Sequence, residues 1–139
     1  MKRLTKNFSS GDRFSVTIGE ITVVEVAAAF SILARRNVIP KRIAERAYRR
    51  FIDEFHTEYD LAHITSSLIL AASELTQKRP LKAYDAVQLA TALRANDLLK
   101  ANDLSLTFVS GDDNLLQAVR AEGLATENPF EHCDLDTAA

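Results

Sequence analysis

The stretch LSLTFVSGDDNLLQAVRAEGLAT, residues 104–126, decides the fold. It opens with Leu104 to Val109, an apolar and partly β-branched run that predicts a strand. After a turn, Asn114 to Ala121 has the pattern of a short helix that Gly123 would end. Leu124 to Thr126 is a candidate for the next strand. Strands separated by helices in this way predict an α/β fold with a parallel sheet.

The same alternation of strands and helices continues toward the N-terminus. Phe14 to Ile18 has the pattern of a half-buried strand, and Ile21 to Arg36 is a predicted helix. The other predicted elements are a helix from Pro40 to about Thr57, a strand at Leu61 to Ile64, and helices from Thr65 or Ser66 to about Gln77 and from Pro80 to about Ala95. In the helix that begins at Pro80, the candidates for core packing are Leu81, Tyr84, Val87, Leu89, Ala90 and Leu93. We therefore expect a parallel sheet flanked by helices.

Length and composition predict one domain. The chain has 139 residues, 47% of them hydrophobic, which is enough apolar surface for one core. We expect residues 14–129 to form this domain, with an irregular segment at 1–13 and a tail at 130–139. The single cysteine, Cys133, excludes a scaffold held together by disulfides.

The charge balance and the apolar runs restrict the possible surroundings of the protein. Seventeen basic and nineteen acidic residues give a net charge of −2, so no bulk field draws the chain toward nucleic acid or membrane. The longest apolar stretch, Val23 to Ala34, is too short to span a bilayer and is interrupted by Glu25 and Ser31. No apolar segment follows the basic N-terminus, so we expect a cytoplasmic protein without a secretory signal.

Several acidic residues occupy positions where ligands bind in open parallel sheets, just after strands or in the first turns of helices. The main candidates are Glu25, Asp85 and Asp112, and the auxiliary candidates beside the last are Ser110 and Asp113. Carboxylates brought together repel each other, so such a cluster needs protons or a cation, and Mg²⁺ or Mn²⁺ suits oxygen ligands. A metal held in this way can activate water against a phosphodiester.

Each of these acids also has a purely structural interpretation. Glu25 can complete a capping box with Thr22. Asp85 can interact favourably with the N-terminus of its helix, and Asp112 can cap the helix that follows the turn. Asp113 can be a solvated acid of the first helical turn. No acid identifies a site by itself, and the argument for one depends on the combination.

Three sequence segments carry a resemblance to a known family. TVVEVAAAF (22–30), LKAYDAVQLATAL (81–93) and FVSGDDNLLQAVRAEGL (108–124) resemble three consecutive motifs of the PIN domain. The resemblance is closest to the VapC-type toxins of bacterial toxin–antitoxin pairs and covers about residues 13–129. Its most specific part is the Tyr-Asp-Ala-x-x-Leu-Ala pattern at residues 84–90.

The resemblance implies a Mg²⁺- or Mn²⁺-dependent ribonuclease with a PIN-like fold. By this analogy Glu25, Asp85 and Asp112 are the catalytic acids of the metal site. Ser110 stands at the position of the family's hydroxyl residue, and Asp113 is an auxiliary acid. The resemblance further implies RNA as the substrate, a VapB-type antitoxin as a partner, and a homodimer as the assembly.

The chain departs from the family pattern at its start. The family begins with a central strand that ends in Asp, whereas Met1 to Arg13 has no apolar strand and Asp12 does not end one. We therefore expect a PIN-like sheet without its first, central strand and a metal site short of one carboxylate. The chain as given would be unstable and weakly active, and an in-frame strand ending in Asp upstream of Met1 would identify an earlier start.

A basic helix face and three histidines are the remaining candidates. The arginines that share one face of the helix after Pro40 are Arg42, Arg46, Arg49 and Arg50. This face can be solvated, with Glu45 as a local partner, or it can contact RNA phosphates or an antitoxin. The histidines without metal-ligand spacing, expected at the surface or at strand ends, are His56, His63 and His132.

Two alternative functions remain open at this point. A non-catalytic PIN remnant could act as a binding module that keeps surfaces for an antitoxin or for dimerisation. An unrelated helical regulatory domain would instead contain very little strand.

Overall fold

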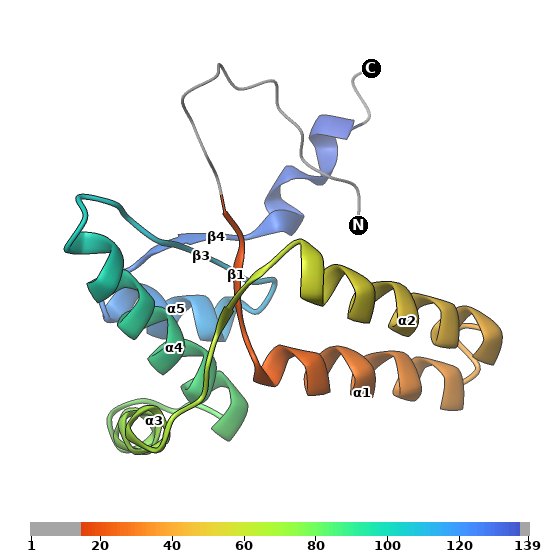
Figure 1. Cartoon of the computed structure of the whole chain (residues 1–139), viewed down its shortest axis with the longest axis horizontal. Coiled ribbons are helices and arrows are strands. Elements are labelled where there is room, and N and C mark those ends of the chain that lie inside the picture. Colours follow the sequence, from red (N-terminus) through yellow and green to blue (C-terminus); the bar gives the residue numbers. More distant parts are fainter. Residues whose placement is uncertain (1–14, 137–139) are drawn as a thin grey trace. The chain divides into compact units, whose positions relative to one another are not determined.

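The computed structural model of the chain describes residues 15–136 (Figure 1). It is 64% helical with two small parallel sheets. The elements in chain order are β1 (Thr17–Gly19), α1 (Ile21–Arg35), α2 (Lys41–Thr57), β2 (Asp60–Ala62), α3 (Ser66–Lys78), α4 (Ala83–Lys100), β3 (Thr107–Val109), α5 (Asp113–Ala121), β4 (Ala125–Glu127) and the 3₁₀ helix η1 (Pro129–Asp136). Within these residues, no helix combines the length and hydropathy needed to cross a membrane.

The predicted α/β class is confirmed, but the strands form two sheets where one was expected. β1 pairs with β2, and β3 pairs with β4. In the second sheet Thr107 lies opposite Ala125 and Val109 lies opposite Glu127, in parallel register. Among the described residues no strand pairs with both β1 and β3, so the two ladders are separate sheets. A PIN-like arrangement therefore stays a prediction.

The chain divides into two compact units. The first comprises residues 1–18 and 22–61, and the second comprises residues 19–21 and 62–139. Of the described elements, α2 lies wholly in the first unit, whereas α3, α4, β3, α5 and β4 lie wholly in the second. The predicted irregular segment 1–13, together with Phe14 of the first predicted strand, lies outside the described residues.

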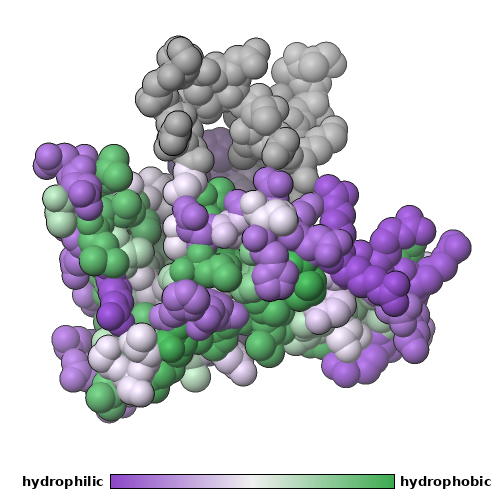
Figure 2. All heavy atoms as spheres, in the orientation of Figure 1, coloured by the Kyte–Doolittle hydropathy of each residue, from purple (hydrophilic) through white to green (hydrophobic). Residues whose placement is uncertain are grey.

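Helix α2 of the first unit is strongly amphipathic. Its buried residues are Ala44 and Phe55, and the ring of Phe55 lies 6.2 Å from that of Phe51, one turn earlier. The side chains visible over α2 are mostly hydrophilic (Figure 2). Helix α1 begins at Ile21, one residue before the Thr22 of the predicted capping box, so Thr22 is not its N-cap.

The second unit contains the main hydrophobic core. Helices α3 and α4 pack together, and α5 packs on β4. The cluster they enclose is centred on Leu89 and Val119, both with no exposed surface, and it includes Leu68, Leu75 and Ala86. Figure 1 shows these elements gathered around α4. This unit can form a core because α3 and α5 are amphipathic and because the middle of α4 is mostly apolar.

Two predictions made from the sequence pattern of α4 were wrong, the burial of one side chain and the end of the helix. Tyr84, predicted to pack in the core, is 54% exposed. The helix continues to Lys100 instead of ending near Ala95, and a Schellman-type cap then closes it. In this cap the N–H of Leu104 donates to the carbonyl of Leu99, which removes Leu104 from the predicted strand and shortens β3.

Local end signals of other helices were predicted correctly. Thr65 caps α3 by accepting a hydrogen bond from the N–H of Leu68 at 3.3 Å. Gly123 follows α5 with φ of +87°, a conformation that costs glycine little because it has no Cβ. The described part of the predicted tail at 130–139 belongs to the short 3₁₀ helix η1.

Glu20 joins the ends of β1 and β2 within the second unit. Its carboxylate accepts a hydrogen bond from the N–H of Ile64 at 2.9 Å and pairs with Nδ1 of His63 at 2.6 Å. The Ile64 backbone bond, followed by the His63 contact, lowers the pKa of Glu20 below its ordinary value. The ionised carboxylate is therefore the form that the native structure favours.

We expect Glu20→Gln to remove part of the acid sensitivity of this protein. A native pKa below the unfolded one means that Glu20 stabilises the fold above the unfolded pKa and loses this contribution as pH falls through the native pKa. Urea midpoints measured between about pH 7 and pH 3 should thus fall less steeply in Glu20→Gln than in the wild type. Glu74→Gln, on the exposed face of α3, should keep the wild-type slope. Identical slopes for Glu20→Gln and the wild type would contradict this role.

Candidate active site

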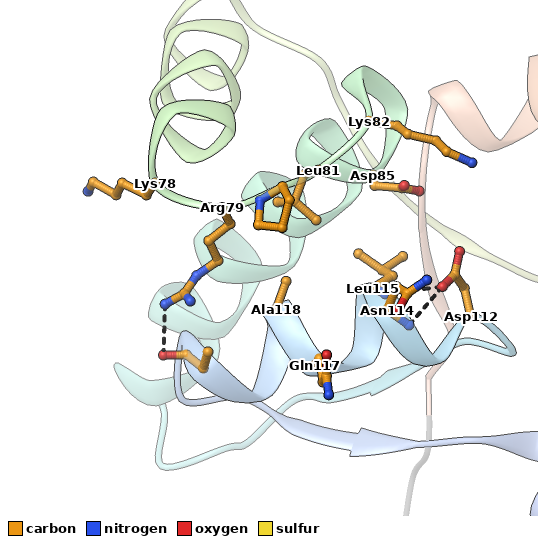
Figure 3. Close-up of a pocket in the computed structure, with 12 residues that line it drawn as sticks. Lys78, Arg79, Leu81, Lys82, Asp85, Asp112, Asn114, Leu115, Gln117 and Ala118 are labelled. Carbon is orange, nitrogen blue, oxygen red and sulfur yellow. Dashed lines mark hydrogen bonds between the residues drawn. The ribbon is translucent and has the colours of Figure 1, made fainter.

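A pocket of about 660 Å³ in the second unit brings together two of the predicted acids (Figure 3). It lies between the segment that joins α3 to α4 and the exposed side of α5. Its lining residues are Lys78, Arg79, Pro80, Leu81, Lys82, Asp85, Asp112, Asn114, Leu115, Gln117, Ala118 and Ala121. Asp85 and Asp112 come from different helices and lie at the same end of this pocket in Figure 3.

Asp85 stands in the first turn of α4 and is half-buried, as its position on an apolar helix predicts. The next residues, Ala86 and Val87, are buried in the core and hold the start of the helix in place. Within residues 15–136 no hydrogen bond or ion pair occupies the Asp85 carboxylate. Its oxygens are therefore available to a ligand in the pocket.

Asp112 caps a helix with one of its two carboxylate oxygens. Its Oδ1 accepts hydrogen bonds from the N–H groups of Asn114 at 2.9 Å and Leu115 at 3.2 Å, which makes it the N-cap of α5. The capping interpretation is thus confirmed, and it fixes the orientation of the carboxyl group. In the described structure Oδ2 makes no such bond, so the cap leaves one oxygen for a ligand.

The two auxiliary residues support the turn that carries Asp112. The hydroxyl of Ser110 accepts a hydrogen bond from the N–H of Asp112 at 3.1 Å. Asp113 accepts a bond at 3.0 Å from the side-chain amide of Asn128, which is buried. Asp113 is an exposed acid of the first turn of α5, as its structural interpretation predicts, and it does not line the pocket.

Cationic side chains line the same pocket. Lys82 lies at the same end of the pocket as Asp85 and Asp112 in Figure 3, whereas Lys78 and Arg79 lie at the other end. Arg79 is engaged, since its Nε bonds Glu122 at 2.6 Å and ties the segment before α4 to the end of α5. Lys82 is exposed and forms no ion pair with any described residue, so its charge is available to an anion near the two acids.

The donor set at this end of the pocket fits Mg²⁺ or Mn²⁺ in kind. Both metals prefer oxygen ligands, and Mg²⁺ in particular is commonly held by one or two carboxylates with water and substrate phosphate completing its shell. Asp85 and Asp112 supply two carboxylates. In the described part of the chain, however, no three His, Cys, Asp or Glu side chains are arranged to hold a metal ion without such help.

The third predicted acid and the basic face belong to the first unit. Glu25 is half-buried in α1, and its part in a metal site with Asp85 and Asp112 stays a prediction. The four predicted arginines, all exposed on α2, are Arg42, Arg46, Arg49 and Arg50. Only the last of them has an ion pair among the described residues, with Glu54 at 2.8 Å. Their contact with RNA or an antitoxin also stays a prediction.

The histidines lie where the sequence placed them. His56, His63 and His132 are exposed, and the last two pair with Glu20 and Glu127 respectively. They do not approach one another as metal ligands in the described structure. Cys133 lies in η1.

Sequence reasoning did not identify Lys82 as part of the site. Its position could have indicated this, because Lys82 directly precedes α4 and lies three residues before Asp85. Asn128 was also missed, because its role depends on a contact with Asp113 that only the folded chain creates.

Comparison of the chain with protein-family models, curated proteins and solved structures gave no significant match. The likeness to PIN domains therefore rests on the three sequence motifs.

Proposed function

We propose that this chain is a metal-dependent endoribonuclease of the PIN-domain, VapC toxin type. The observation that carries the proposal is the shared pocket of Asp85 and Asp112, with the cationic Lys82 at its edge. These two acids belong to the two most specific family-like motifs. Carboxylates can hold a metal that activates water against an RNA phosphodiester, and a free ammonium group beside them can attract the phosphate.

Each side chain has a defined task in this proposal. Asp85 and Asp112 would hold Mg²⁺ or Mn²⁺, and the bound ion would supply polarisation of the phosphodiester and activation of water. The α5 cap holds the Asp112 carboxyl group in one orientation, so little ordering is needed when the site is occupied. Lys82 would attract and position the phosphate through its charge. Water adds to phosphorus, the bond to the leaving oxygen breaks, and that oxygen takes up a proton.

Glu25 is the third metal-site acid of the proposal. RNA as the substrate, a VapB-type antitoxin as the partner, and a homodimer belong to it through the same family resemblance. The arginines of α2 are candidates for the RNA or antitoxin contact.

The proposal is tested by RNA cleavage with matched substitutions of Asp112. Labelled RNA should be cut in Mg²⁺ or Mn²⁺, and excess EDTA should stop the reaction. Asp112→Ser should lose cleavage while keeping its melting temperature, because serine caps a helix as well as aspartate does but cannot replace the carboxylate at a metal. Asp112→Ala should lose the cap as well, at a cost of about 0.5–2 kcal/mol in stability. Cleavage that persists in EDTA or in Asp112→Ser would reject the metal mechanism.

The second candidate is a non-catalytic binding module. It is favoured by the lack of a three-ligand metal group among residues 15–136. Well-folded wild-type protein that cuts no RNA in either metal would support this candidate over the nuclease.

A further inference from the structure

Phe130 is an exposed aromatic ring held against the turn that precedes Asp112. The residue is 70% exposed, more than any other large apolar side chain of the described structure. Its ring nevertheless presses on Gly111. A Cβ at Gly111 would lie 2.9 Å from Cδ2 of Phe130 and closer still to Cε2, so a larger residue at position 111 would require the ring to move.

The backbone of Phe130 is fixed to the same turn. Its N–H donates to Oδ1 of Asn128 at 3.0 Å, and Nδ2 of Asn128 donates to Asp113 at 3.0 Å. Asn128 is buried with both ends of its amide engaged. Two independent contacts, one through Gly111 and one through Asn128, thus hold the ring beside the start of α5 while most of its surface faces solvent.

An aromatic ring that is both held and exposed is a platform for a flat apolar ligand. Leaving such a ring in water costs free energy, and a side chain with two rotatable bonds loses little entropy when a ligand stacks on it. Gly111, which contacts the ring, directly precedes Asp112 in the chain. The flat groups that an RNA chain presents beside its phosphates are its bases, and stacking of a base on an aromatic side chain does not depend on the identity of the base.

We propose that Phe130 stacks on a nucleobase of the RNA and thereby positions the strand at the Asp85–Asp112 pocket. This inference rests on the proposed function, which supplies RNA as the ligand. Phe130 is a positioning residue in this scheme and does not touch the reacting atoms. Because a base in a duplex has both faces covered by its neighbours, the ring selects a base that is unpaired and unstacked.

The absence of tryptophan from the whole sequence allows a direct test. Phe130→Trp places a single indole at the ring position, and a uridine oligoribonucleotide added in EDTA, which prevents cleavage, should quench its fluorescence. Leu98→Trp is the matched control, since Leu98 is 67% exposed near the C-terminal end of α4, whereas Asp85 lies in the first turn of that helix. Its fluorescence should not change. An abasic ribose-phosphate oligomer should bind through charge and leave the Phe130→Trp signal unchanged.

A second measurement uses affinity. Phe130→Leu should bind a fluorescein-labelled uridine oligonucleotide in EDTA about five- to a hundredfold more weakly than the wild type, the loss expected for one stacked base. Phe130→Trp should bind at least as well as the wild type.

Three results would overturn the inference. These are an unquenched Phe130→Trp at saturating oligonucleotide, equal quenching by the abasic oligomer, and wild-type affinity in Phe130→Leu. Wild-type affinity in Phe130→Leu would indicate that the exposed ring contacts another protein instead of a base. Binding and quenching without any Mg²⁺-dependent cleavage would instead reject the proposed nuclease and leave the base platform standing. A wild type that binds no oligonucleotide would reject both.

Discussion

Asp85→Asn should reduce metal-dependent RNA cleavage by at least about a hundredfold, the loss expected when a metal site loses one of the two carboxylates that line this pocket. Asparagine has the same shape as aspartate but lacks the charge that holds a divalent cation. The fold should survive, because the side chain has no hydrogen bond to lose within the described residues. The loss of a favourable charge in the first turn of α4 costs about 0.3–2 kcal/mol.

The control for this substitution lies on the same helix. Asp97→Asn removes an equal charge from an exposed position of α4 that does not line the pocket of Asp85. It should cut RNA at the wild-type rate. Cleavage rates at several Mg²⁺ concentrations, together with circular dichroism for each variant, provide the comparison. Wild-type rates in both variants would remove Asp85 from the mechanism. An equal loss of rate in both variants would indicate an effect of net charge alone.

The features that could be predicted from sequence are those decided within a few residues. The Thr65 cap, the turn at Gly123 and the cap by Asp112 depend only on a side chain and the backbone beside it. The α/β class followed in the same way from alternating patterns. The two acids of the pocket were predicted as partners, together with Glu25, because all three lie just after strands or in the first turns of helices, where open parallel sheets bind ligands.

The features that could not be predicted depend on contacts between distant parts of the chain. Tyr84 has the spacing of a core residue, but the first turn of α4 presents it to solvent. Leu104 belongs to an apolar run, yet its N–H closes the end of α4 and is lost to the strand. The contact of Phe130 with Gly111 has no local signal at all. Its two residues are nineteen apart in sequence, and they meet where β3 pairs with β4 and Asn128 bonds Asp113.

The stability of the site should depend on Leu89, one turn after Asp85 on the same helix. Leu89 has no exposed surface and lies in the core that α3, α4 and α5 enclose. Leu89→Ala removes three heavy atoms from a close-packed region and leaves a cavity, which typically costs about 2–5 kcal/mol. Since a domain is stable by only about 5–15 kcal/mol, this one change can remove a large part of the total.

Thermal and urea unfolding would measure this effect against a control on the same helix. At about 4 °C per kcal/mol, Leu89→Ala should melt roughly 8–20 °C below the wild type. Leu98→Ala shortens the same residue type where it is 67% exposed, and its stability should stay within about 0.5 kcal/mol of the wild type. Both variants should keep the helical signal at low temperature. Equal melting points for the two would mean that α4 is not packed as described, and the positions of Asp85 and Lys82 in the pocket would then lose their support.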